Sequence, residues 1–249
     1  MYKIPAKTLF VGKKLIFLTT CHSTNDEAYA IMSSGGLPEG SMIVTDEQTQ
    51  GRGQMGNTWE SEPKKNLTFS IIFKPGFLPV AEQFRLTQAI SLGILDALNP
   101  FASEFSIKWP NDIYHGTKKI GGILIQNVLS GKKIEYSIAG IGLNVNQRIF
   151  DNADAQSLAR ITGQDQDRQE LLGALAEAIE RRYLDLKNRR YDRLHQDYLS
   201  SLYRFGEDHL FRAGEIFSGR IIDVLPSGEL VMDTRWGERN FWFKEVEFV

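Results

Sequence analysis

The chain has 249 residues, of which 42% are hydrophobic and 24% are charged, so it can bury the core of one large domain with a smaller one beside it. Its formal net charge of -2 argues against the strong basic field of a dedicated nucleic-acid-binding protein, and we expect no nucleic-acid partner. The single cysteine forms no internal disulfide, and the first twenty residues contain no apolar run of membrane length. We therefore expect a cytoplasmic protein without a membrane partner.

The first 140 residues are predicted to alternate strands with helices. Ser23 and Thr24 are typical of a helix start, and Gly35 is typical of its end. Residues 81–98 repeat apolar side chains at helical spacing, which predicts a second helix packed against the core. Runs of β-branched and aromatic residues predict strands at residues 14–19, 41–45, 67–73, 105–108, 120–128 and 134–140.

The last third of the chain changes from a helical to a β-rich pattern. Residues 168–203 predict a pair of helices broken near Asn188. Turn residues then separate predicted strands at about 213–224, 228–233 and 239–248, which indicate a short antiparallel barrel or sheet. We therefore predict a boundary near Phe205, with one domain at residues 1–206 and a small one at residues 207–249.

The loop from Gly51 to Gly56 has glycine at its first, third and sixth positions, as a dinucleotide-binding fingerprint does. No helix follows the loop directly, however, and no acidic residue stands about 20 positions later, which argues against that fingerprint. The glycines can still bring backbone N–H groups close to an anion, and Arg52 adds a permanently charged donor. The loop alone leaves an anion site and a flexible connection equally open.

Three further segments place polar side chains directly after predicted strands. Residues 108–112 combine a cation, a large ring and short polar side chains, and Lys119 enters a strand beside Gly121 and Gly122. Residues 140–146 end another strand with small residues and side-chain amides. Each segment alone is more often a turn or a solvated surface. Together they predict one site for an anionic ligand.

With these segments in order, the sequence resembles the biotin protein ligase family across essentially the whole chain. The matching residues are Ser23-Thr24-Asn25, Gly51-Arg52-Gly53 through Trp59, Lys108-Trp109-Pro110-Asn111-Asp112, Lys119-Ile120-Gly121-Gly122, and Gly140 through Asn144. The resemblance implies an α+β fold: a catalytic domain with a mixed β-sheet and helices, like that of class II aminoacyl-tRNA synthetases, and a C-terminal SH3-like barrel. It also implies an enzyme that activates biotin with ATP to biotinyl-5′-AMP and transfers it to a lysine of a biotin carboxyl carrier protein domain.

The resemblance also implies roles for individual residues. The residues expected to bind biotin are Ser23, Thr24, Asn25, Gln48, Gly51, Arg52, Lys119, Gly122 and Gly142. Those expected to bind ATP or the adenylate are Arg52, Trp59, Lys108, Asn111, Lys119 and Asn144. The expected catalytic residues are Arg52, Lys108, Lys119 and Asp112, and Asp112 is also the candidate ligand for Mg²⁺.

The chemistry of such a reaction explains these residue types. When a carboxylate attacks the α-phosphate of ATP, two anions meet, so Arg52, Lys119 and Mg²⁺ are expected to offset their repulsion. The adenylate is sensitive to water, and we expect residues 49–59 to close over it. In the second step Asp112 is the candidate for orienting the incoming lysine amine or accepting its proton.

This sequence departs from the regulatory members of the family at two positions. Those members carry basic residues where this chain has Gln54 and Asn57, which leaves open how tightly the adenylate is retained. The chain also begins at the predicted catalytic domain without a preceding helix-turn-helix, so we expect an enzyme without a repressor role. Related enzymes include monomers and dimers, and the sequence leaves a homodimer open.

Two other functions deserve comparison. A lipoate protein ligase would share the fold and the adenylate chemistry, but its paired-arginine segment and triple glycine are missing here. A non-catalytic biotin-binding module would keep the contacts to the ureido ring and lose the charged residues, whereas Arg52, Lys108, Asp112 and Lys119 are all present. The four histidines have no ligand-like spacing, so we expect no zinc site.

Overall fold

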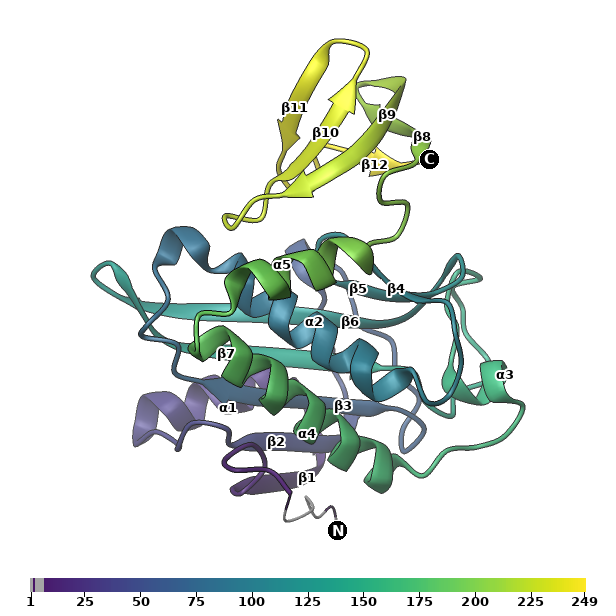
Figure 1. Ribbon diagram of the computed structural model, residues 1–249. Helices are drawn as coiled ribbons and strands as arrows, with labels where there is room; N and C mark the ends of the chain where they lie inside the picture. The colour runs from purple at the N-terminus through teal and green to yellow at the C-terminus, as the bar shows by residue number, and fades with distance from the viewer. Residues whose placement is uncertain (1, 3–6) are drawn as a thin grey trace.

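The computed structural model describes residue 2 and residues 7–249, so residues 1 and 3–6 of the predicted first domain lie outside the described part. A large sheet has the strand order β1-β2-β3-β7-β6-β5-β4, and a smaller sheet has the order β11-β10-β9-β8-β12 (Figure 1). In the large sheet β1 and β2 run parallel and the other neighbours antiparallel. This mixed sheet with its helices confirms the α+β class, and the smaller sheet fits an SH3-like domain.

The elements follow one another in an order close to the predicted one. The first part comprises β1 (Leu15–Cys21), α1 (Thr24–Ser34), β2 (Met42–Gln48), a 3-10 turn (Gln54–Gly56), β3 (Leu67–Phe73), a second 3-10 turn (Val80–Glu82) and α2 (Phe84–Leu98). Next come β4 (Phe105–Lys108), β5 (Asp112–His115), β6 (Lys118–Ser130), β7 (Lys133–Leu143), α3 (Leu158–Thr162), α4 (Arg168–Lys187) and α5 (Tyr191–Ser200). The smaller sheet contains β8 (Asp208–Ala213), β9 (Glu215–Val224), β10 (Leu230–Thr234), β11 (Gly237–Phe241) and β12 (Glu247–Phe248).

Two strands and one α-helix were not predicted: β5, β8 and α3. β5 is four residues long and begins with Asp112, so it has no strand-like pattern of its own, and its pairing with β4 and β6 makes it a strand. The predicted strand at 239–248 is divided into β11 and β12 because the chain turns between them, where Lys244 adopts a positive φ of 72°. In the described part of the chain, no helix combines the length and the apolar character needed to cross a membrane.

The side chains of β3 divide the large sheet into two different faces. Phe69, Ile71 and Phe73 belong to the main core, which also contains the buried residues of α2 and α4. Ile72 points to the opposite face and packs near Ala28 of α1. Figure 1 shows α2 and α4 crossing one face of the sheet. Because successive side chains alternate, Thr68 and Ser70 lie on the α1 face of this strand.

The smaller sheet contacts the large one through the segment that follows β4. The indole nitrogen of Trp109 donates a hydrogen bond to the Gly228 carbonyl at 2.9 Å, and its ring meets Phe243 edge-on at 6.2 Å. The backbone N–H of Phe84 donates to the Pro226 carbonyl at 3.2 Å. These contacts place the chain after β11 beside the segment between β4 and β5.

A buried carboxylate on α4 fixes the segment that leads into β1. The Glu180 side chain, 5% exposed, accepts hydrogen bonds from the backbone N–H groups of Leu9 at 2.6 Å, Phe10 at 2.7 Å and Val11 at 2.8 Å. One side chain thus supplies acceptors to three consecutive backbone N–H groups that would otherwise need other partners. The segment before β1 is therefore tied to the helix layer.

We expect Glu180→Gln to lower the free energy of unfolding by about 3 kcal/mol, because buried backbone donors lose a charged acceptor. For a chain of this size that change corresponds to a fall in melting temperature of about 6–12 °C, measurable by calorimetry. Glu177→Gln on the same helix is the matched control, since Glu177 has no hydrogen-bond or ion-pair partner among the described residues. Equal melting temperatures for the two variants would contradict the anchoring role.

Candidate active site

A cavity of 720 Å³ lies where the large sheet meets the chain after β11. Its wall includes the start of α1, the end of β2, the loop after Gly51, residues 108–112, and parts of β6 and β7. The predicted site residues that line it are Ser23, Thr24, Asn25, Gln48, Arg52, Trp59, Lys108, Asn111, Asp112, Lys119, Gly122 and Gly142. Segments far apart in the sequence thus meet around one cavity.

Two predicted site residues lie behind the wall. A side chain at Gly51 would overlap the Trp59 carbonyl, so this glycine lets two backbone segments approach closely. Asn144 is buried, and its amide nitrogen donates to the Gln156 carbonyl at 3.0 Å while its Oδ1 has no partner in the described part. Neither residue is among those that line the cavity.

One end of the cavity is lined by uncharged polar groups. The backbone N–H of Thr24 donates to Gln48 Oε1 at 2.8 Å, and the Thr24 hydroxyl lies 3.2 Å from the same oxygen. These bonds orient the Gln48 amide so that its nitrogen remains free to donate. Ser23 is the N-cap residue of α1 and is only 3% exposed. Its hydroxyl nevertheless makes no capping hydrogen bond. Ser23 and Gln48 therefore keep donors for a ligand.

Asn25 is buried at this polar end, and its side-chain amide forms hydrogen bonds within the protein. Its amide nitrogen donates to Gln126 Oε1 at 2.9 Å and approaches the Leu124 carbonyl at 3.3 Å. A side chain at Gly140 would overlap the Asn25 amide, so the absence of a Cβ there makes room for it. Asn25 is thus held between β6 and β7.

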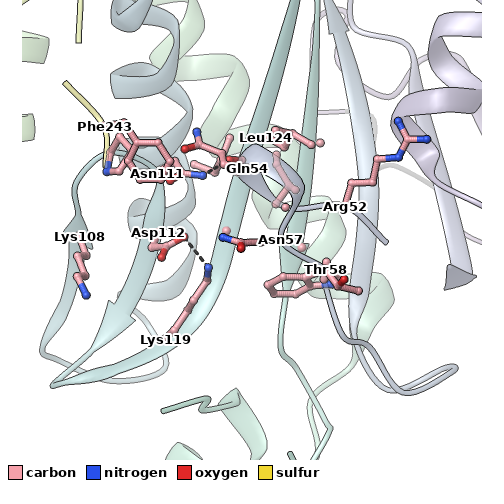
Figure 2. A pocket seen from close by; sticks show the side chains of 18 of the residues that line it. Arg52, Gln54, Asn57, Thr58, Lys108, Asn111, Asp112, Lys119, Leu124 and Phe243 are labelled. Atoms are coloured by element: carbon pink, nitrogen blue, oxygen red, sulfur yellow. Dashed lines mark hydrogen bonds and ion pairs between the residues drawn. The ribbon is translucent and has the colours of Figure 1, made fainter. Parts of the chain in front are cut away.

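The other end of the cavity contains a close pair of opposite charges. Lys119 Nζ and Asp112 Oδ1 are 2.7 Å apart, with the side chains 34% and 25% exposed (Figure 2). The two residues come from β6 and β5, and the pairing of these strands brings Asp112 opposite Gly122. A side chain at Gly122 would contact both Asp112 and Lys119 at about 3.4–3.5 Å. Gly122 therefore leaves space beside the pair.

Lys108 is held by aromatic rings at the same end. Its amine donates to the Tyr114 hydroxyl at 3.2 Å and lies 5.0 Å from the ring centre of Phe248. Burial lowers the pKa of Lys108, although the negative charge of Asp112 opposes this shift. Burial also raises the pKa of Tyr114 to about 12, so its hydroxyl stays neutral and can accept this bond. Nearby, the Asn111 amide donates to the Ile123 carbonyl, which fixes the turn before β5.

Arg52 lines the cavity, but its guanidinium does not point toward the charged pair of Lys119 and Asp112. Its guanidinium pairs with Asp26 at 3.0 Å, and the two side chains are 55% and 37% exposed. Figure 2 shows Arg52 pointing away from Lys119 and Asp112. The structure therefore does not bring the cations of Arg52 and Lys119 together. Exposed ion pairs contribute little, about 0–1 kcal/mol, so a bound anion can compete for Arg52.

Trp59 covers the strand at Gly142. A side chain at Gly142 would overlap the indole ring, which means that the ring lies directly against the β7 backbone. The indole nitrogen is buried and has no partner in the described part of the chain. The loop after Gly51 thus places a large ring on the floor of the cavity, and Gln54 and Asn57 of the same loop also line the wall.

Several lining residues were not predicted. Phe243, Lys244, Val246, Glu247 and Phe248 form part of the wall, and nothing in their local sequence indicates this, because the packing of the two sheets decides it. Thr68 also lines the cavity. The sequence could have indicated this, because Thr68 is a polar residue between Leu67 and Phe69 in a largely apolar strand. In a fully buried strand such a residue marks a face that carries polar groups.

The cavity wall contains two carboxylates, and both are paired. Asp112 contacts Lys119, and Glu247 contacts Arg212 at 3.2 Å. Within residues 7–249, no group of three or more His, Cys, Asp or Glu side chains could hold a metal ion. Mg²⁺ is usually held by one or two carboxylates together with substrate phosphates, so this wall suits a metal that arrives with a nucleotide.

Comparison with known proteins identifies relatives along almost the whole chain. The model of the biotin/lipoate A/B protein ligase family matches residues 18–144. The bifunctional ligase/repressor BirA of Bacillus spizizenii is 29% identical over 97% of this chain and 76% of its own length. The biotin–[acetyl-CoA-carboxylase] ligase of Paracoccus denitrificans is 29% identical over 93% of this chain and 99% of its own.

A solved structure has the same overall arrangement. The biotin protein ligase from Aquifex aeolicus in complex with biotin and ATP superposes with a TM-score of 0.79 at 28% identity. The match covers 95% of this chain and 100% of the Aquifex chain. The likeness therefore includes both the large and the smaller sheet.

We expect Gly142→Ala to displace the Trp59 ring, because a Cβ at this position would overlap the indole. The added methyl should destabilise the fold by about 1–3 kcal/mol and change the near-ultraviolet circular dichroism of the tryptophans. Gly76→Ala is the control, since its Cβ would meet only the Ile134 carbonyl at an ordinary 3.8 Å. An unchanged spectrum in Gly142→Ala would mean that the ring does not rest on β7.

Proposed function

Because the chain belongs to the biotin/lipoate A/B protein ligase family, we infer that it is a biotin protein ligase. It activates biotin with ATP to biotinyl-5′-AMP and pyrophosphate and then transfers biotin to a lysine of a biotin carboxyl carrier protein domain. The observation that carries this conclusion is one cavity that joins buried hydroxyl and amide groups at one end to Lys108 and Lys119 at the other. Relatives named as biotin ligases match over most of the chain, which supports the same reaction.

The polar end suits the ureido ring of biotin. This ring has one carbonyl acceptor and two N–H donors, and it needs partners of both kinds. Ser23 and Gln48 offer donors to the carbonyl, while Thr24 and Asn25 offer oxygen atoms to the N–H groups. The dithiolane ring of lipoate forms no comparable hydrogen bonds and would leave these enclosed groups unpaired, so we favour biotin over lipoate.

The charged end suits the activation step. The biotin carboxylate and the α-phosphate of ATP approach each other there, and Lys119 is the cation best placed to stabilise the developing charge. Arg52 exchanges Asp26 for the bound anion, and Lys108 and Asn111 serve the nucleotide. Asp112 would hold Mg²⁺, which supplies positive charge to the phosphates when bound. Gly122 leaves space for the ligand beside β6, and Gly142 lets the Trp59 ring rest on β7 next to the ligand.

The loop after Gly51 protects the adenylate. Trp59 gives it an aromatic surface for stacking against adenine, and residues 49–59 exclude water from the mixed anhydride. Gly51 and Asn144 act from behind the wall, Gly51 by allowing the close approach of Trp59 and Asn144 by fixing the end of β7. Gln54 and Asn57 line this region as uncharged groups, so the loop attracts the adenylate less strongly than a basic loop would.

The second step requires a neutral lysine amine from the carrier. Asp112 orients this amine or accepts its proton as the amine attacks the acyl carbon, and AMP leaves. The ion pair with Lys119 keeps the Asp112 carboxylate at the reacting end of the cavity. The charged residues needed for both steps argue against a non-catalytic biotin-binding module.

The proposed reaction also suggests roles for the two domains and a cellular location. We propose that residues 1–206 form the catalytic domain and that residues 207–249 form a small domain whose Phe243–Phe248 segment closes the nucleotide end. A reaction that consumes ATP fits the cytoplasm. The low net charge argues against a nucleic-acid partner, and a homodimer is left open.

One assay separates the ligase from its alternatives. The protein is incubated with ATP, Mg²⁺ and either biotin or lipoate, and both pyrophosphate release and the mass of an apo carrier domain are followed. A biotin ligase releases pyrophosphate with biotin and adds the mass of one biotinyl group to the carrier. Activity with lipoate alone would establish the lipoate ligase, and biotin binding without pyrophosphate would establish the binding module.

Replacing Lys119 by alanine should slow adenylate formation about a hundredfold, or about 3 kcal/mol, if Lys119 acts as a preorganised charge in the transition state. The rate is measured by pyrophosphate release at saturating biotin and ATP. Lys118→Ala is the matched control, because neighbouring strand residues point to opposite faces. An undiminished rate in Lys119→Ala would reject this role.

A further inference from the structure

A buried serine lies directly behind the polar end of the cavity. Ser70, on β3, is 0% exposed, and it is not among the residues that line the cavity. Its Oγ lies 2.7 Å from Thr24 Oγ1 and 2.6 Å from Asn25 Oδ1. Ser70 therefore contacts two residues proposed to bind the ureido ring without reaching the ligand itself.

Ser70 completes the hydrogen bonding that fixes the Asn25 amide. The amide nitrogen faces Gln126 Oε1 at 2.9 Å and the Leu124 carbonyl at 3.3 Å, both of which are acceptors. The amide oxygen faces Ser70, which can donate to it. Donor and acceptor ends of Asn25 are thus held by different partners, and a reversed amide would place nitrogen against the serine and oxygen against two acceptors.

The same hydroxyl also connects Asn25 to Thr24. A hydroxyl has one proton and can accept two further hydrogen bonds. If Ser70 donates to Asn25, its oxygen can accept the Thr24 proton, which otherwise has Gln48 Oε1 at 3.2 Å as its acceptor, and the Thr24 oxygen can then accept a hydrogen bond from a ligand. Gln48 retains the backbone N–H of Thr24 as a donor to its Oε1, so its orientation does not depend on the serine.

We propose that Ser70 is a positioning residue that sets the polar end of the cavity to accept hydrogen bonds from a cyclic urea, and so favours biotin over a ring without N–H groups. This inference rests on the proposed function. Ser70 acts through Thr24 and Asn25, whose oxygens it holds as acceptors. Without its hydroxyl, these side chains lose their common partner, and the buried Asn25 oxygen is left without a donor.

The effect should be confined to the ring end of the ligand. Ser70 lies on β3, and its hydroxyl bonds to Thr24 and Asn25 and not to Lys108, Asp112 or Lys119, which serve phosphate chemistry. Loss of the hydroxyl should therefore weaken biotin binding without changing ATP binding. It should also leave the turnover rate at saturating biotin nearly unchanged, because the same ring contacts exist in the ground state and the transition state.

The test compares Ser70→Ala with the unmodified protein and with Ser91→Ala. Ser91, on α2, is also 0% exposed, and its hydroxyl has no partner among the described residues, so it controls for the loss of a buried hydroxyl. Dissociation constants for biotin and for ATP are measured by calorimetry on the full chain. The specificity for biotin over lipoate is taken from the kcat/KM of pyrophosphate release with each acid.

We expect Ser70→Ala to weaken biotin binding about tenfold and to reduce the preference for biotin by a similar factor. Binding of ATP and kcat should stay within about twofold of the unmodified protein, and Ser91→Ala should change none of these values. Ser70→Cys, of similar shape but with a weaker donor, should fall between the serine and alanine proteins.

The inference is overturned if Ser70→Ala binds biotin as tightly as the unmodified protein, or if ATP binding weakens as much as biotin binding. The second result would mean a general structural role. Should Ser70→Ala fail to fold, Ser70→Cys decides by the same criteria. Failure of the proposed function has a different signature, since the unmodified protein itself would then show no biotin-dependent release of pyrophosphate.

Discussion

Side chains along β3 alternate between the two faces of the large sheet, and this alternation separates an apolar face from a partly polar one. This strand is buried along its whole length, and its neighbours β2 and β7 are fixed by backbone pairing on both sides. One face must be apolar because helices cover it, and Phe69 and Ile71 satisfy that need. The other face can then carry polar groups, provided that each finds a partner. The cavity exists because this second face is polar near the start of α1.

Charge in the cavity is controlled by pairing. Lys119 is compensated by Asp112, and Arg52 by Asp26, so the free protein does not hold several uncompensated cations close together. The two pairs differ in exposure, and the more exposed Arg52 pair is the more easily exchanged for a bound anion. A reaction between two anions can thus recruit positive charge when the ligands bind.

The smaller sheet contributes to the cavity through a few contacts that are distant in sequence. Trp109 ties the turn after β4 to Gly228 and Phe243, and Phe248 packs against the Lys108 amine. Both Trp109 and Lys108 belong to the same short segment. The segment proposed to serve the nucleotide therefore also contacts the smaller sheet, which couples the stability of this interface to the geometry of the cavity.

Local features were predictable from the amino acids alone: β3 and β4 have the predicted bounds, and the segments around Thr24, Lys108 and Lys119 meet at one cavity. These features depend on residue type and spacing over a few positions. Four features became apparent only in three dimensions: Arg52 pairs with Asp26, Asn144 lies behind the wall, Ser70 supports Asn25, and most of the Phe243–Phe248 segment lines the cavity. Such contacts arise from the order and register of strands and from the packing of two sheets. They join residues far apart in the chain, whose proximity leaves no periodic signal in the sequence.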